Sequence, residues 1–237
     1  MTILINYAHR SHYTSQAFNT KSGYMHGFDK VVAYGRYSLP SQFLKDHAHI
    51  LSQEKGAGYW LWKPWIILDA FNNADFGDFI FYCDSGAEFI ASINPLIALC
   101  DQHSRVLFHT DPIPGNIEAQ QTKRDAFVLM DCDESDYADA VPVHAGFQIY
   151  KKSDENLNFL GDYLYYCQDH RIMTDGDNVM GKPNYPEFLR HRHDQSVLSL
   201  LRTQWRFKTF RDPTQYGNPY ITDGEYGQII NHTRNNE

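Results

Sequence analysis

The apolar run Phe79–Cys83 (FIFYC), followed at once by Asp84-Ser85-Gly86, decides the fold of this chain. A short run of consecutive apolar residues between two turn-forming segments is typical of a strand that is buried on both faces. Such strands occur mainly in parallel sheets that helices cover on each side. The run therefore predicts a buried strand of an α/β fold.

The rest of the chain alternates strand-like and helix-like segments, as an α/β fold requires. The other predicted strands are 2–7, 30–34, 105–109, 145–150 and 206–210. The predicted helices are 14–19, 41–51, 64–71, 95–103, 122–130, 154–168 (with Ser153 as its cap) and 194–203. The segment 174–187 and the tail from residue 211 read as loops. We therefore expect one domain, 1–237, with a mostly parallel central sheet flanked by helices.

The composition is that of a folded domain with an unusual share of aromatic residues. The chain has 237 residues, of which 42% are hydrophobic and 15% aromatic, enough for a large single core. Its net charge of −8 argues against unaided binding to nucleic acid or to an anionic membrane. An anionic substrate would need a local cluster of Arg or Lys, or a bridging cation. The aromatic surplus suits a site that packs flat rings against a sugar or a base.

The sequence predicts a cytoplasmic protein without an integral membrane segment. Its start lacks the pattern of a signal peptide, and no run approaches the ~20 apolar residues of a membrane span. Cys83, Cys100, Cys132 and Cys167 are spread along the chain without a Cys-x-x-Cys pair. This spacing indicates neither a zinc site nor a disulfide framework, so we expect reduced thiols.

Asp84 is the first candidate site residue because it directly follows the buried strand. In open α/β sheets, ligands bind beyond the carboxyl ends of the strands, and Gly86 lets a ligand approach the backbone closely. Carboxylates bind Mg²⁺ or Mn²⁺, which can neutralise a departing diphosphate. A turn-capping role for Asp84 is the alternative. The rival pair Asp131 and Asp133 follows a helical segment among other acidic residues, which is typical of a solvated face.

Lys63 lies in the run 58–65 (GYWLWKPW), which holds three of the four tryptophans. An extended conformation would put Lys63 on the face opposite to two of them. A buried lysine is costly unless an anion or a carboxylate meets it. A diphosphate or a nucleotide is one candidate partner, and a structural ion pair with Asp69 or Asp78 is the other.

Asp194 and Gln195 begin a predicted amphipathic helix, directly after His191 and His193. The segment offers several proton carriers, although an Asp at a helix start is also an ordinary cap. The chain lacks the glycine-rich dinucleotide fingerprint, the P-loop and the nucleophile elbow. Rossmann oxidoreductases, P-loop enzymes and α/β-hydrolases are therefore disfavoured.

Several of these motifs follow one another in a recognisable order. They are Gly-x-Gly-Tyr-Trp-x-Trp-Lys-Pro (56–64), Tyr-x-Asp-x-Gly (82–86), Thr-Lys-Arg-Asp (122–125), His-Asp-Gln-Ser (193–196) and a terminal His-x-Arg (232–234). The series resembles a group of A-type-fold (GT-A) glycosyltransferases from bacterial surface-polysaccharide clusters and large DNA viruses. The likeness spans nearly the whole chain. It departs from the family at Gly86, where the usual Asp-x-Asp has its second Asp, so the metal shell is completed by Asp84 alone, by Glu88 or by a distant His.

The resemblance implies a metal-assisted transfer of a hexose from a nucleotide diphosphate sugar, UDP-linked, to a saccharide acceptor, as in polysaccharide biosynthesis. The cation would be Mn²⁺ or Mg²⁺. Residues 1–110 would bind the nucleotide sugar, and residues 111–237 the acceptor. The alternative is a non-catalytic protein that binds nucleotides or carbohydrates and has a degenerate metal site.

The resemblance also assigns roles to residues. It implies metal ligation by Asp84 and His232, donor binding by Lys63, Tyr82, Ser85, Gly86, Arg124 and Arg234, and catalysis by Asp194, Gln195 and Asp125. In an inverting transfer Asp194 would be the base that takes the acceptor hydroxyl proton. In a retaining transfer Gln195 would stabilise the positively charged sugar.

Overall fold

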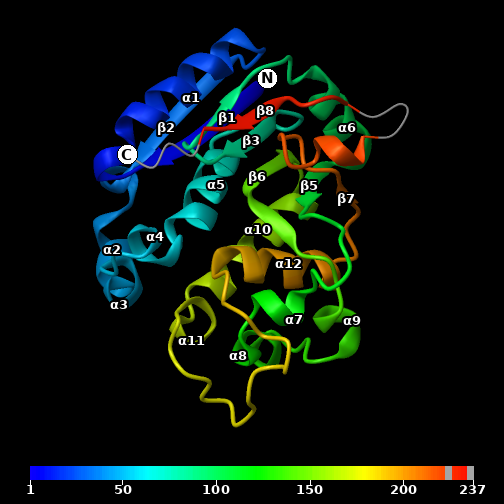
Figure 1. Cartoon of the computed structure of the whole chain (residues 1–237). Coiled ribbons are helices and arrows are strands. Elements are labelled where there is room, and N and C mark those ends of the chain that lie inside the picture. The colour runs from blue at the N-terminus through cyan, green and yellow to red at the C-terminus, as the bar shows by residue number, and fades with distance from the viewer. Residues whose placement is uncertain (222–225, 234–237) are drawn as a thin grey trace.

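The central sheet has six strands in the order β2-β1-β3-β6-β5-β7 (Figure 1). The computed structural model describes residues 1–221 and 226–233. The strands are β1 (Thr2–Ala8), β2 (Lys30–Gly35), β3 (Phe79–Cys83), β5 (Arg105–His109), β6 (Val143–Lys151) and β7 (Thr209–Phe210). β2, β1 and β3 pair in parallel, as do β5 and β7, whereas β6 runs antiparallel to both of its neighbours. The predicted α/β class with a mostly parallel sheet is confirmed.

Helices cover both faces of this sheet. The longer ones are α1 (Tyr13–Met25), α5 (Trp62–Asn72), α6 (Asn94–His103), α10 (Asp154–Cys167) and α12 (Asp194–Gln204). The shorter ones are α2 (Ser41–Asp46), α3 (Ala48–Leu51), α4 (Gly56–Tyr59), α7 (Glu118–Gln121), α8 (Arg124–Leu129), α9 (Ser135–Ala138) and α11 (His170–Met173), with 3-10 turns at Arg10–His12, Arg36–Ser38 and Asn218–Tyr220. α5, α10 and α12 pack on one face, and α1 and α6 on the other.

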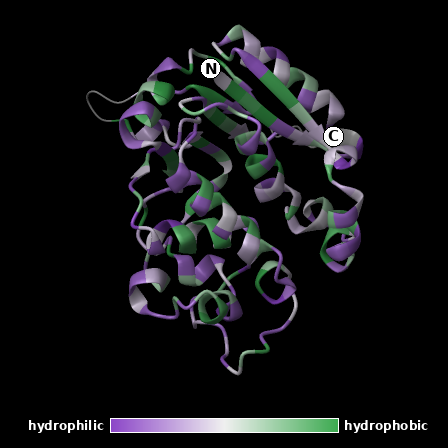
Figure 2. Ribbon diagram, turned by 180° about the vertical axis from the view of Figure 1, so that it is seen from behind, coloured by the Kyte–Doolittle hydropathy of each residue, from purple (hydrophilic) through white to green (hydrophobic). Residues whose placement is uncertain are grey.

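The strand β3 is buried on both faces, as its apolar run predicts. Ile80 and Tyr82 belong to the core cluster beneath α5, α10 and α12, while Phe81 and Cys83 belong to the cluster on the opposite face. All four side chains are at most 1% exposed. Figure 2 shows the hydrophobic residues that run along the strands of the sheet. The end of β3 is therefore held rigidly, and Asp84 with it.

Three sequence-based expectations differ from the structure. The helix expected over 41–51 is divided into α2 and α3, because His47 leaves the helical region with φ −109° and ψ 24°. The strand expected over 206–210 is reduced to β7. The tail expected to be a loop contains β8 (Ile230–His232), which pairs antiparallel with β4 (Ala87–Phe89). A three-residue strand carries too little pattern to be recognised without its partner.

The aromatic run 58–65 is not extended, so the face assignment that an extended conformation would give does not apply. Its first residues form a tight turn with positive φ angles, and Trp62 begins α5. Lys63 therefore lies in the first turn of a helix, with Pro64 beside it where a missing backbone N–H is tolerated.

The cysteines and the helices agree with two further expectations. All four cysteines are buried and unbonded, and burial raises the pKa of the Cys83 thiol well above its usual range. Within the described residues, no helix combines the length and the apolar character needed to cross a membrane.

Candidate active site

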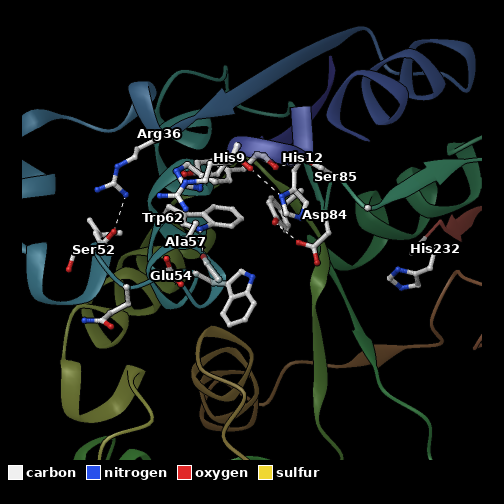
Figure 3. A pocket seen from close by; sticks show the side chains of 18 residues that line it. His9, His12, Arg36, Ser52, Glu54, Ala57, Trp62, Asp84, Ser85 and His232 are labelled. Carbon is white, nitrogen blue, oxygen red and sulfur yellow. Dashed lines mark hydrogen bonds between the residues drawn. The ribbon is translucent and has the colours of Figure 1, made fainter. Parts of the chain in front are cut away.

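Two cavities meet at the carboxyl ends of β1 and β3. The first cavity, of about 780 Å³, is lined among others by Tyr7, His9, Arg36, Trp62 and Ser85 (Figure 3). The second cavity, of about 290 Å³, is lined among others by Lys63, His144, Gly146, Arg190, Asp194 and Gln195. Trp60, Asp84 and His232 line both cavities. The junction of the two cavities is thus the position that the sequence indicated for ligand binding.

Asp84 projects from the end of β3 into this junction. Its backbone N–H donates to the carbonyl of Gly146 on β6 (2.9 Å), which extends the sheet by one residue. Its side chain is 42% exposed, and one carboxylate oxygen accepts a hydrogen bond from the Tyr82 hydroxyl. A Cβ at position 146 would lie 3.0 Å from the other oxygen, Oδ2. The glycine therefore leaves one side of the carboxylate open.

Lys63 bridges Asp84 and Asp194 beneath the junction. Its ammonium lies 2.7 Å from Asp194 Oδ2 and 3.6 Å from Asp84 Oδ1, and its side chain is 4% exposed. Burial alone would lower the pKa of Lys63, but the two carboxylates outweigh this effect and raise it. Burial raises the pKa of Asp194, against the opposing effect of Lys63. The three groups carry a net charge of −1 at the wall of the second cavity.

The expected structural partners of Lys63 were wrong. Asp69 accepts a hydrogen bond from the Tyr34 hydroxyl (2.7 Å), and Asp78 binds the N-terminal amine of Met1 (2.6 Å). Sequence spacing favoured Asp69 and Asp78 because they are near Lys63 in the chain. The helical conformation of 62–72 instead directs the ammonium toward the two carboxylates that the motif analysis had selected.

Asp194 is the first residue of α12, and His193 occupies the cap position. His193 has φ 55° and ψ −118°, and its side chain makes no capping hydrogen bond. Its ring nitrogen Nδ1 instead lies 2.8 Å from the carbonyl of Met173. The Asp194 side chain is 5% exposed and also lies 3.4 Å from the Tyr163 hydroxyl, which donates to it. The Asp194 carboxylate is thus directed toward Lys63.

The first cavity has an aromatic wall. The rings of Tyr7 and Trp62 stack with centroids 3.8 Å apart and planes inclined by 13°. The Trp62 indole N–H donates to the carbonyl of Gly56 (2.9 Å), which fixes the ring. In Figure 3, Arg36 and Ser52 lie on one side of Trp62, and Asp84 lies on the other. Both rings are largely buried, so they form a firm apolar wall between a cation and a carboxylate, which suits a ligand with both a ring and an anionic group.

A cluster of basic side chains lines the first cavity, although the whole chain is acidic. It consists of His9, Arg10, His12 and Arg36. Arg36 donates from Nη1 to the carbonyl of Leu51 (2.9 Å), which orients its guanidinium. Burial and the neighbouring Arg10 and Arg36 lower the pKa of His9, and the two guanidinium groups are the permanently charged members of the cluster. The sequence analysis did not select these residues, although His9 follows β1, and Arg36 follows β2, as directly as Asp84 follows β3.

The tail brings His232 to the same wall. β8 pairs with β4 so that His232 lies opposite Ala87. The backbone N–H of Thr233 donates to the carbonyl of Gly86 (3.0 Å), and the Ser85 hydroxyl donates to the carbonyl of Tyr7. Tyr82, Ser85, Gly86 and His232 thus all line the first cavity.

Two of the expected site residues, Asp125 and Arg124, are not brought to the junction. The Asp125 carboxylate accepts hydrogen bonds from the backbone N–H groups of Val179 (2.7 Å) and Met180 (3.0 Å), and so anchors the loop 174–187. Arg124 pairs with Asp133 (2.6 Å) of the rival acidic pair. Neither Asp125 nor Arg124 lines either cavity. Arg234 lies outside the described residues.

Asp84 and His232 are the residues that could hold a cation at the junction. Within the described part of the chain, no group of three or more His, Cys, Asp or Glu side chains is arranged to hold a metal ion. The open side of Asp84 beside Gly146 and the imidazole of His232 nevertheless supply donors that suit Mn²⁺, and a diphosphate and water would complete its shell. A cation held by these two residues would need further donors from a substrate.

The fold is shared with known glycosyltransferases. Mouse xyloside xylosyltransferase 1 in its apo form superposes with a TM-score of 0.53 and 10% identity, over 99% of this chain and 97% of that chain. The apo WbbM bifunctional glycosyltransferase superposes with a TM-score of 0.50 and 8% identity, over 84% of this chain and 37% of that chain. A glycosyltransferase involved in glycosylation of the major capsid of PBCV-1 gives a TM-score of 0.47 and 12% identity, over 98% of this chain and 93% of that chain. The predicted glycosyltransferase fold is confirmed.

At the level of sequence, no family model and no curated protein matches the chain. Identities of 10% and 8% to the first two proteins mean that the shared feature is the fold, and the chemistry must be argued from the site itself.

Proposed function

We propose that this protein transfers a sugar from a nucleoside diphosphate donor to an acceptor hydroxyl at the junction of the two cavities. The observation that carries the proposal is that Asp84 lines both cavities. Lys63 forms ion pairs both with Asp84 and with Asp194, which lines the second cavity. A transfer between two substrates needs such a shared wall, because both substrates must reach one reacting atom together.

The first cavity supports binding of the donor. Tyr7 and Trp62 give this cavity an apolar aromatic wall against which a nucleobase can pack, and Arg10 and Arg36 offer positive charge to a diphosphate. From the resemblance of the motifs, we propose that the donor is UDP-linked, that the transferred group is a hexose and that the acceptor is a saccharide.

Mn²⁺ or Mg²⁺ held by Asp84 and His232 would neutralise the charge that develops on the departing diphosphate. The chain's own contribution is to hold the Asp84 carboxylate at the sheet end through Gly146 and the Tyr82 hydroxyl. A preorganised carboxylate costs no rearrangement when the charge develops.

Asp194 is the group in the second cavity that can take the acceptor proton. The acceptor oxygen bonds to the anomeric carbon, the bond from that carbon to the diphosphate oxygen breaks with its electron pair, and the proton passes to the carboxylate. Burial raises the pKa of Asp194, which makes it a stronger base than an exposed Asp. Lys63 holds the carboxylate in place, and Gln195 lines the same cavity. Asp125 has no part in this scheme, because its oxygens are bound to the loop 174–187.

A panel of nucleotide sugars tests the proposal. The protein is incubated with each donor, with and without Mn²⁺, and the released nucleoside diphosphate is measured. We expect release from at least one donor, and loss of that release in Asp84→Asn. Asp101→Asn is the matched control, because Asp101 is an exposed carboxylate that pairs with Lys151 away from both cavities. Nucleotide binding without release from any donor would contradict transfer and favour a binding protein.

A further inference from the structure

The tight turn before α5, which consists of the short element α4 (Gly56–Tyr59) and Trp60, has a left-handed backbone over five consecutive residues. The φ angles are 58° at Gly56, 52° at Ala57, 105° at Gly58, 50° at Tyr59 and 62° at Trp60. For an L-residue this region is unfavourable, and three of the five are not glycine. Strain of this kind persists only where the surrounding structure enforces it, and it gathers at functional sites. The need to connect α3 with α5 does not by itself explain the strained backbone of this turn.

Close contacts fix the turn and the Trp60 ring. A Cβ at position 58 would lie 2.7 Å from the Cα of Leu51, so the backbone of Gly58 passes directly over α3. A Cβ at position 56 would lie 2.4 Å from the Trp60 indole, so the ring covers Gly56. The Tyr59 N–H donates to the carbonyl of Lys55 (2.7 Å), which closes the turn. Both glycines are thus required for the ring to lie where it does.

The strained turn directs Trp60 to the junction of the two cavities. The ring stacks on His193 with centroids 5.4 Å apart and planes inclined by 27°. His193 itself has a φ of 55° and directly precedes Asp194. Trp60 lines both cavities and is only partly buried. Two strained segments, distant in sequence, thus place a partly exposed indole at the cavities that Asp84 and Asp194 line.

We propose that the Trp60 indole is the platform of a subsite for the sugar that is transferred. One face of a pyranose ring presents C–H groups that pack on an aromatic face, while its hydroxyls at the rim stay free for hydrogen bonds. The inference rests on the proposed function, because a sugar bound between a diphosphate in the first cavity and an acceptor in the second must lie at this junction. Trp60 acts here as a substrate contact that selects the sugar.

The test compares ligands with and without the sugar. Calorimetry measures the affinity of the wild type, Trp60→Ala and Trp60→Phe for UDP and for a panel of UDP-hexoses, with Mn²⁺ present. We expect Trp60→Ala to weaken the binding of a UDP-hexose roughly three- to tenfold, as the loss of one ring contact does, and to leave UDP binding within about twofold. Trp60→Phe keeps a flat ring and should retain most of the affinity for the UDP-hexose.

Trp205→Phe is the control, because Trp205 packs on Phe159 and Phe207 and lines neither cavity. Thermal melts of each variant verify that it is folded. Equal weakening of UDP and UDP-hexose by Trp60→Ala, or no weakening of either, would overturn this inference and leave the proposed function standing. If Trp60→Ala does not fold, the same comparison in Trp60→Phe decides: a loss shared equally by UDP and UDP-hexose would overturn it. If the wild type binds neither UDP nor any UDP-hexose, the UDP-linked donor and this inference are both overturned.

Discussion

The substitution Lys63→Met removes the cation that lies between Asp84 and Asp194 and keeps most of the aliphatic stem. The Lys63 and Asp194 side chains are 4% and 5% exposed, and their charged atoms are 2.7 Å apart. Removing one partner of a buried pair leaves an uncompensated charge and costs about 3–5 kcal/mol. For a chain of this size each kcal/mol lowers Tm by about 2–4 °C, so we expect a loss of roughly 6–20 °C near pH 8.

The loss should depend on pH. Burial already raises the pKa of Asp194, and without the ammonium this pKa rises further in the folded state. A carboxyl with a raised pKa favours folding at low pH, and this contribution disappears as the pH rises through the folded pKa. The difference between wild type and variant is therefore largest at high pH and shrinks as the pH falls.

Urea unfolding of both proteins across this pH range is the assay, with Lys63→Met/Asp194→Asn as the companion variant. Removing the charge of Asp194 should restore much of the stability that Lys63→Met loses. A Lys63→Met protein within about 1 kcal/mol of wild type at pH 8 would refute the buried bridge, given the cost expected for a broken pair. Loss of nucleoside diphosphate affinity with stability unchanged would instead show that Lys63 serves the substrate.

Three further predictions follow from the same geometry. Asp194→Asn should lower the transfer rate by at least ~10²-fold while nucleoside diphosphate affinity stays within about twofold, and a rate near that of wild type would remove Asp194 from the chemistry. Gly56→Ala should destabilise the fold by at least ~1 kcal/mol, since φ is 58° and the new Cβ would meet the Trp60 ring. A melting temperature equal to that of the wild type would contradict the strained turn. Burial raises the pKa of Glu118 to about 8, so its favourable contribution to stability is lost as the pH rises through about 8. Between about pH 6 and 9, the unfolding free energy measured in urea should therefore fall less for Glu118→Gln than for the wild type. Identical pH slopes for wild type and Glu118→Gln would count against a buried, protonated Glu118.

Strands buried on both faces were the most predictable part of the fold. β3 and β5 have the bounds that their apolar runs indicate, because burial on two faces demands continuous hydrophobicity. The same reasoning located Asp84, since the end of a buried strand opens into the ligand crevice. β8 could not be found this way, because its three residues gain their structure from pairing with β4.

The contacts of the site were less predictable than its members. Lys63, Asp84 and Asp194 were each selected, but their bridge depends on how α5 and α12 pack, which local pattern does not encode. The left-handed turn over 56–60 was also beyond prediction, because its two glycines are compatible with many loops and Tyr59 and Trp60 are held there by packing against His193. Long-range packing thus decides both features.

The rate of nucleoside diphosphate release by Asp84→Asn is the most direct measurement of the central claim that transfer occurs where the two cavities meet. Asn keeps an acceptor for the Tyr82 hydroxyl and removes the charge, so the unfolding free energy should change little. With the best donor and Mn²⁺ present, we predict a fall of about 10²–10³-fold relative to wild type and to Asp101→Asn. Release within a factor of about three of the wild-type rate would contradict the claim, because the loss of one preorganised charge should slow release far more than this.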